Sequence, residues 1–151
     1  WMVRRQRQMC IRDRYWGNPE STATAFADGW FLTGDIAVID EGAYRILGRA
    51  SIDIIKSGGY KLSALEIEAT LLEHPDVSEV AVIGVPDDEW GELVAAAVVL
   101  ANPVSEDDLV QWSRERMSGY KVPRKWIFTD ALPRNALGKV TKPSLSAWFE
   151  G

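Results

Sequence analysis

Residues 51–68 read SIDIIKSGGYKLSALEIE, and this stretch decides the fold that the sequence predicts. Residues 52–56 and 60–62 are short, largely apolar runs on either side of Ser57-Gly58-Gly59. Paired glycines favour a tight turn, because glycine has no Cβ atom and adopts positive φ values at little steric cost. We therefore predict a β-hairpin here.

A helix is predicted to follow this hairpin directly. Ser63-Ala64-Leu65-Glu66 fits a capping box, in which the serine accepts from one backbone N–H and the glutamate reaches back to another. Leu65, Ala69 and Leu72 recur at helical spacing and mark the expected apolar face. His74-Pro75 is expected to end the helix.

Strand and helix patterns alternate over the rest of the chain. The turn Glu41-Gly42 predicts a second hairpin, and Ser105 is expected to cap a second helix. The expected strands are 36–39, 44–47, 77–85, 93–101 and 126–128, followed by a loop at 133–139 and a short helix at 144–149. This interleaving predicts an α+β domain with a short mixed sheet flanked by helices.

Composition excludes several function classes. The net charge is −5, with 22 acidic against 17 basic side chains, which argues against a nucleic-acid or anionic-membrane partner. The longest apolar run, residues 93–101, is far shorter than the roughly 20 residues of a membrane span. A single cysteine excludes an internal disulfide, and the sequence has no Cys/His cluster for a metal. We expect a cytoplasmic protein.

The first fourteen residues differ from the rest of the chain. They contain five arginines and no hydrophobic period. A basic targeting peptide would bring serines and a small-residue cleavage pattern, which are missing. We interpret residues 1–14 as a foreign or artefactual segment.

Three polar segments are hard to explain by packing alone. Asp35, after Thr33-Gly34, stands at the start of an expected strand, where its carboxylate could accept two hydrogen bonds from a ribose diol. The alternative is a turn aspartate that binds its own backbone.

The second segment joins Gly48-Arg49 to Ser57-Gly58-Gly59 and Lys61. An arginine can hold a ribose or phosphate oxygen through its fork of donors, and a diglycine lets a ligand approach the backbone closely. An ordinary hairpin with a surface arginine explains the same residues.

The third segment is Gly138-Lys139, in the loop that begins at Pro133. A lysine on such a loop can enter a site built elsewhere and neutralise charge between a carboxylate and a phosphate. Most surface lysines have no such role, and the glycine spacing of a P-loop is missing.

Taken in order and at this spacing, the segments resemble one family. The chain is similar to the C-terminal part of the adenylate-forming superfamily, which contains acyl-CoA synthetases, peptide-synthetase adenylation domains and firefly luciferase. Residues 51–66 resemble malonate–CoA ligases most. The matching stretches are GWFLTGD at 29–35, GR at 48–49, SGGYK at 57–61, ALEIE at 64–68, VAVIGVPD at 80–87, LPRN at 132–135 and GK at 138–139.

The resemblance implies a domain organisation. Residues 15–48 would be the tail end of a large N-terminal adenylation domain, including a β-hairpin remnant, and residues 49–151 a mobile C-terminal lid. The large domain, with its phosphate-gripping loop and acyl pocket, would be the missing partner. We therefore expect this fragment to be inactive alone.

The resemblance also implies a reaction in two steps. ATP and a carboxylic acid, such as malonate or another short acid of fatty acid metabolism, would give an acyl-adenylate and pyrophosphate. Coenzyme A then displaces AMP to form the thioester. Mg²⁺ is expected with the ATP, on ligands outside this fragment.

Residue roles follow from the same resemblance. Asp35 and Arg49 would bind the ribose, and Lys139 would contact phosphate and carboxylate oxygens during adenylation. A rotation about the hinge Ser51 would then bring in the coenzyme A residues, with Ser57, Gly58 and Gly59 lining the pantetheine tunnel and Lys61 meeting a phosphate. The family often has Asp or Lys at the hinge, so the serine is a departure.

Two alternatives stay open. The chain could be the lid of an adenylation domain that loads a carrier protein instead of free coenzyme A. It could also be a standalone binding module without chemistry of its own.

Overall fold

The computed structural model describes residues 14–149, which form two compact units, 14–34 and 35–149. The first unit contains α1 (Pro19–Ala25) and the short antiparallel strands β1 (Phe26–Ala27) and β2 (Trp30–Phe31). Asn18 begins α1 by accepting a hydrogen bond from the Ser21 amide at 2.9 Å. The segment 1–14 that we interpret as foreign lies, except for Arg14, outside the described residues.

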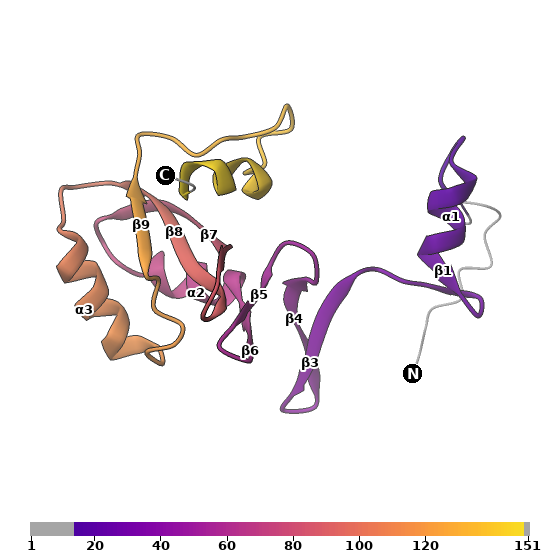
Figure 1. Ribbon diagram of the computed structural model, residues 1–151, viewed down its shortest axis with the longest axis horizontal. Helices are drawn as coiled ribbons and strands as arrows, with labels where there is room; N and C mark the ends of the chain where they lie inside the picture. Colours follow the sequence, from indigo (N-terminus) through magenta and orange to yellow (C-terminus); the bar gives the residue numbers. More distant parts are fainter. Residues whose placement is uncertain (1–13, 150–151) are drawn as a thin grey trace. The chain divides into compact units, whose positions relative to one another are not determined.

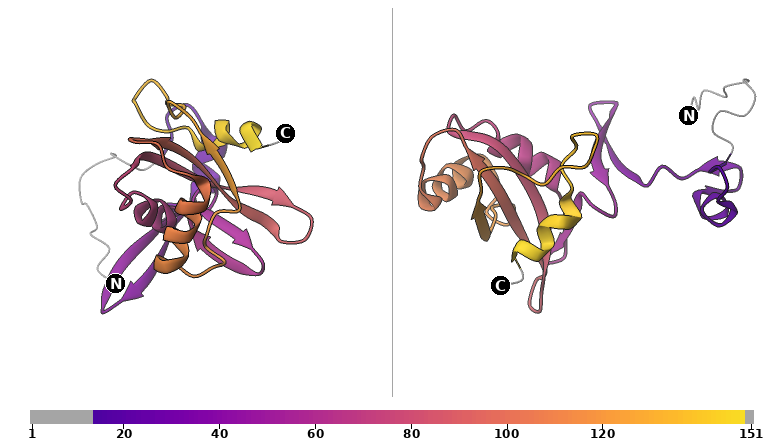
Figure 2. Two further views of the ribbon diagram at one scale, coloured as in Figure 1. Left: turned by 90° about the vertical axis from the view of Figure 1, so that its left-hand side faces the viewer. Right: turned by 90° about the horizontal axis from the view of Figure 1, so that it is seen from above.

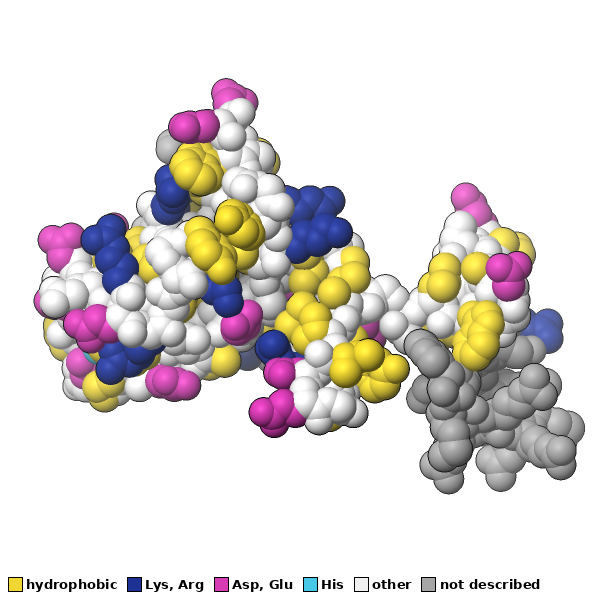
Figure 3. Space-filling view, turned by 90° about the horizontal axis from the view of Figure 1, so that it is seen from below, with side chains coloured by type: hydrophobic (Ala, Val, Ile, Leu, Met, Phe, Trp, Pro, Cys, Tyr) yellow, Lys and Arg dark blue, Asp and Glu magenta, His cyan; other side chains and the backbone are white. Residues whose placement is uncertain are grey.

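The second unit opens with the predicted hairpin of β3 (Asp35–Asp40) and β4 (Ala43–Arg49). Glu41 and Gly42 both have positive φ, as a two-residue hairpin turn requires. Ile39, Tyr44 and Ile46 lie on one face of the hairpin, because Ile39 pairs with Tyr44 and side chains alternate along a strand. All three are more than 60% exposed, and hydrophobic side chains reach the surface in the middle of Figure 3.

The main sheet is mixed, as predicted. Strands β6, β5, β8 and β7 pair antiparallel in that order, and β9 pairs parallel with β8 (Figure 1). The strands are β5 (Ile54–Ser57), β6 (Tyr60–Ser63), β7 (Val77–Asp87), β8 (Gly91–Leu100) and β9 (Lys125–Phe128).

Helices cover both faces of this sheet. Buried residues of α2 (Ala64–Leu71) and α3 (Glu106–Arg116) pack in one core cluster, and those of the 3₁₀ helix η1 (Lys142–Phe149) in another (Figures 1 and 2). Alternating side chains of β7 divide between the two: Val80 and Val82 join the first cluster, whereas Ala81 and Ile83 join the second. The predicted α+β class is confirmed.

The expected apolar face of α2 is wrong. Leu65 and Leu72 are exposed, and the buried residues are Ala64, Ile67 and Leu71. Both series have helical spacing, so periodicity alone does not fix which one faces the core. The junction between β6 and α2 determines which series is buried, because α2 starts immediately after Ser63, the last residue of β6.

The serine half of the predicted capping box of α2 is confirmed, but the predicted return bond from Glu66 is not found, because its carboxylate pairs with Lys121. Ser63 also bonds to the β3–β4 hairpin. Ser63 Oγ accepts from the Glu66 amide at 3.2 Å and donates to the Leu47 carbonyl at 2.5 Å. The Glu66 carboxylate pairs with Lys121 Nζ at 2.8 Å.

Replacing Ser63 with alanine should therefore lower the free energy of unfolding by about 2 kcal/mol, from the lost cap and the lost bond to β4. Urea unfolding of the chain measures this loss. Ser105→Ala is the matched control, because Ser105 Oγ caps α3 by accepting from the Asp108 amide at 3.1 Å and donates only within the same turn, to Asp108 Oδ2 at 2.6 Å. Equal losses in the two variants would show that the bond to Leu47 stabilises the fold no more than this exposed bond does.

No helix within residues 14–149 combines the length and the apolar character that a membrane crossing needs.

Candidate functional site

Asp35 and Arg49 lie side by side at the open end of the β3–β4 hairpin. They are directly paired across the two strands, and Arg49 Nε is 3.7 Å from Asp35 Oδ1. Both side chains remain accessible to solvent, so the pair adds little stability. It leaves a carboxylate and a guanidinium next to each other on the surface, where a ligand with hydroxyl groups could reach both.

A tight turn joins this hairpin to the sheet. The amides of Ile52 and Asp53 donate to the Arg49 carbonyl at 3.2 and 2.8 Å, and Asp53 Oδ2 accepts from the Arg49 amide at 3.0 Å. Strand β4 therefore continues to Arg49, and β5 starts at Ile54 rather than at the expected residue 52. Ser51, the predicted hinge, is exposed in the middle of this turn.

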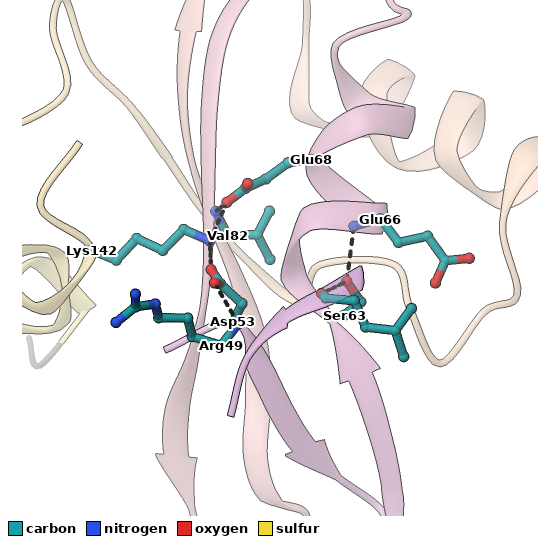
Figure 4. A network of polar contacts seen from close by, with 8 residues as sticks. Arg49, Asp53, Ser63, Glu66, Glu68, Val82 and Lys142 are labelled. Carbon is teal, nitrogen blue, oxygen red and sulfur yellow. Dashed lines mark hydrogen bonds and ion pairs between the residues drawn. The ribbon is translucent and has the colours of Figure 1, made fainter. Parts of the chain in front are cut away.

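A largely shielded lysine reaches the same turn from the other end of the chain. Lys142 Nζ lies 2.7 Å from Asp53 Oδ1 and 2.8 Å from Glu68 Oε1 (Figure 4). The three side chains are only 12–14% exposed. Glu68 Oε1 also accepts from the Val82 amide at 2.7 Å. The Asp53–Glu68–Lys142 cluster thus joins the turn, α2, β7 and η1.

This environment changes the acidity of Glu68. Burial raises its pKa above the ordinary value of 4.5, and the charge and hydrogen bond of Lys142 offset part of the increase. The folded protein therefore holds a proton on Glu68 more readily than the unfolded chain does.

Glu68 should make the free energy of unfolding depend on pH. Its contribution is fully present below the unfolded pKa of 4.5 and is lost as pH rises through the higher folded pKa. We expect wild type to gain stability relative to Glu68→Gln as pH falls through this window. Urea unfolding of both proteins at several pH values tests this, and parallel profiles would contradict it.

The predicted hairpin turn at Gly58-Gly59 is confirmed. Both glycines have positive φ, at 55° and 82°. The Gly58 amide donates to the Trp90 carbonyl at 2.9 Å, and a Cβ atom on Gly58 would lie 2.9 Å from the Trp90 ring. Ser57 is buried just before the turn, and Lys61 is exposed just after it. The turn is therefore a fixed surface with bare backbone at its tip.

Aromatic side chains extend this surface. Tyr60 stacks on Tyr120 with ring centroids 4.7 Å apart and planes 9° from parallel. The Arg124 guanidinium lies over Trp90, 4.1 Å from the ring centroid. Sequence reasoning did not single out these contacts, because their members are 34–60 positions apart.

Lys139 lies in a loop that is closed by its own hydrogen bonds. Asn135 Oδ1 accepts from the amides of Leu137 and Lys139, both at 3.0 Å, and the Asn135 amide donates to the Lys139 carbonyl at 2.9 Å. At the base, Thr141 donates to the Pro133 carbonyl at 2.8 Å. The side chain of Lys139 is exposed, so the loop presents an ammonium group to solvent from a folded support.

The structure brings some predicted site residues together and separates others. Asp35 and Arg49 are in contact, and Ser57, Gly58, Gly59 and Lys61 share one hairpin. The Lys139 loop and the Gly58-Gly59 turn lie on opposite sides of the sheet domain, at the top and bottom of Figure 1, and Figure 2 shows the same separation. A single neighbouring surface could meet only one of them at a time.

The chain is similar in sequence to one family model and to several CoA ligases. The AMP-binding enzyme C-terminal domain family matches residues 66–139. The mouse (Mus musculus) protein "Malonate--CoA ligase ACSF3, mitochondrial" is 52% identical over 87% of this chain and 23% of its own length. The Mycobacterium tuberculosis protein "Long-chain-fatty-acid--CoA ligase FadD13" is 48% identical over 87% of this chain and 26% of its own.

Among solved structures, ATP-bound MatB from Rhodopseudomonas palustris aligns with a TM-score of 0.81 at 40% identity. The alignment covers 91% of this chain and 28% of MatB. The chain thus spans about a quarter of the length of the relatives it matches, and it is homologous to the C-terminal part of acyl-CoA ligases. Residues 66–139 match the AMP-binding enzyme C-terminal domain family, and the ligases named above are similar to most of the chain in sequence.

Proposed function

We propose that this chain provides the lid of an AMP-forming acyl-CoA synthetase. The observation that carries the proposal is the placement of the Lys139 loop and the Gly58-Gly59 turn on opposite sides of one sheet domain, which the turn at residues 49–53 joins to the β3–β4 hairpin. A rotation at that turn would present the two in succession to one neighbouring site. Presenting first the Lys139 loop and then the Gly58-Gly59 turn to the same site fits a reaction with two steps.

In the first step, a carboxylate oxygen attacks the α-phosphorus of ATP, and the bond to pyrophosphate breaks. The Lys139 ammonium would neutralise charge on the carboxylate and phosphate oxygens. Asp35 would accept hydrogen bonds from the ribose hydroxyls, and Arg49 would donate to the ribose beside it. Their contact at 3.7 Å supports this shared role.

In the second step, the sulfur of coenzyme A attacks the acyl carbonyl, AMP leaves, and the thiol proton passes to solvent. Rotation at Ser51 would withdraw Lys139 and bring forward the turn at 57–59. Its two glycines would let the pantetheine arm lie against the backbone, and Lys61 would meet a coenzyme A phosphate.

The partner of the lid would be a large adenylation domain, to which residues 15–48 belong, with residues 49–151 forming the lid. ATP would bring Mg²⁺. Residues 14–149 hold no group of three or more His, Cys, Asp or Glu side chains that could bind a metal ion, so we assign magnesium to none of them.

Malonate is the first acid to test, because a relative that is 52% identical is named a malonate–CoA ligase. A relative at 48% identity is named for long-chain fatty acids, so lid similarity alone does not separate the two. The acid would be selected by the large domain.

The experiment supplies that domain. Residues 35–151 are joined to the large domain of R. palustris MatB in place of its own C-terminal part, and malonate-dependent release of AMP and formation of malonyl-CoA are measured. We expect both products with free coenzyme A. Acyl-adenylate that passes only to a carrier protein would favour a carrier-loading enzyme, and no adenylate at all would favour a binding module.

A further inference from the structure

The Asp53–Glu68–Lys142 cluster connects two parts of the chain to which the proposed function gives separate roles. Asp53 closes the turn that contains the hinge Ser51, through its Oδ2 and the Arg49 amide. Lys142 is the third residue after Lys139 and the first residue of η1. One ion pair, 2.7 Å long, therefore joins the hinge turn to the segment that carries the ammonium group used in adenylation.

The contacts of the Asp53–Glu68–Lys142 cluster hold the Lys142 ammonium group in one position. The three side chains are largely shielded from solvent, and each carboxylate holds a backbone amide in addition to Lys142: Asp53 the Arg49 amide, and Glu68 the Val82 amide. A shielded ammonium with two such partners has far less freedom than an exposed surface lysine. Lys142 and Ser51 also line the same cavity, of about 230 Å³.

The position of Lys142 also determines the position of the Lys139 loop. Its ends are bonded together at Thr141 and Pro133, next to Lys142, and Leu132 and Leu145 are buried on either side. A shift of Lys142 would therefore displace the loop as a unit. Misplacement of a reacting group by about 1 Å can cost on the order of 10²-fold in rate.

We propose that Lys142 is a positioning residue that holds the Lys139 loop in register with the hinge turn through Asp53 and Glu68. The inference rests on the proposed function. It assigns to Lys142 no contact with ATP, the acid or coenzyme A.

The kinetic test uses Lys142→Met in the joined protein, with the two half-reactions measured separately. Acyl-adenylate formation should fall by about 10²-fold, mainly in kcat, because the loop loses its register. Thioester formation from preformed acyl-adenylate does not use Lys139 and should change less than about 3-fold. Lys142→Arg, which keeps the charge, should restore most of the adenylation rate.

Two further variants keep the result interpretable. Lys121→Met removes another lysine–glutamate pair on α2, 2.8 Å long, and should leave adenylation unchanged. Should Lys142→Met fail to fold, the double variant Lys142→Met/Glu68→Gln removes one unpaired carboxylate and should fold while adenylation stays low. Equal losses in both half-reactions, or no rescue by arginine, would overturn the proposal.

A second measurement separates this inference from the proposed function. Hydrogen exchange on the full 151-residue chain, without any substrate, reports the loop directly. In Lys142→Met, the amides of Asn135, Gly138 and Lys139 should exchange at least about 10-fold faster, whereas those of α3 should not change. Unchanged hydrogen exchange of these loop amides would overturn the proposal that Lys142 positions the Lys139 loop. A joined protein that makes no acyl-adenylate with the wild-type lid would instead overturn the proposed function.

Discussion

Lys139→Ala should lower acyl-adenylate formation in the joined protein by about 10²–10³-fold, the loss typical of one transition-state donor. Thioester formation from preformed malonyl-adenylate should stay near the wild-type rate, because the lysine would be withdrawn in that step. The two half-reactions are measured by pyrophosphate release and by malonyl-CoA formation.

This substitution should leave the fold intact. The hydrogen bonds described for Lys139 are made by its backbone amide and carbonyl, which alanine keeps. The free energy of unfolding should therefore change by no more than about 0.5 kcal/mol. Lys125→Ala removes a lysine from β9 and serves as the control for total charge. Equal loss of both half-reactions in Lys139→Ala would contradict the role assigned to the ammonium group.

Gly48→Ala should be the most destabilising single methyl addition that we can identify in the hinge region. Gly48 is buried with φ at 126°, a conformation that favours glycine, and an added Cβ would lie 2.4 Å from the Asp53 Cβ. Asp53 would have to move away from the Arg49 amide and from Lys142. Backbone strain and overpacking together should cost about 3–5 kcal/mol.

Urea unfolding of the chain measures this cost. Gly42→Ala is the matched control, because Gly42 lies in the turn of the same hairpin with φ at 82° and has no atom within 4 Å of an added Cβ. It should show the backbone strain alone, about 1–3 kcal/mol. If Gly48→Ala costs no more than Gly42→Ala, the close approach to Asp53 has no energetic weight.

Much of the fold follows from local sequence signals. The turns at Glu41-Gly42 and Gly58-Gly59 and the caps at Ser63 and Ser105 depend only on neighbouring residues, and the structure confirms all four. The buried face of α2 could not be predicted in the same way. Helical spacing allows either the Leu65 series or the Ile67 series, and the choice depends on the tertiary junction with β6.

The residues of the candidate site also differ in whether local sequence signals predict them. Arg49, Gly58-Gly59 and Lys139 are visible in the sequence because short motifs surround them. Lys142 is not, because its partner Asp53 lies 89 positions away and no spacing rule connects them. This ion pair forms only when the turn at residues 49–53 and the start of η1 meet in the folded chain.

The exposed face of the β3–β4 hairpin has a consequence for the isolated chain. Ile39, Tyr44 and Ile46 form an exposed apolar ribbon on a two-stranded sheet. Such ribbons attract their own copies, strand against strand. Without a covering surface, the chain should therefore be prone to aggregate as its concentration rises, and dilute samples suit it best.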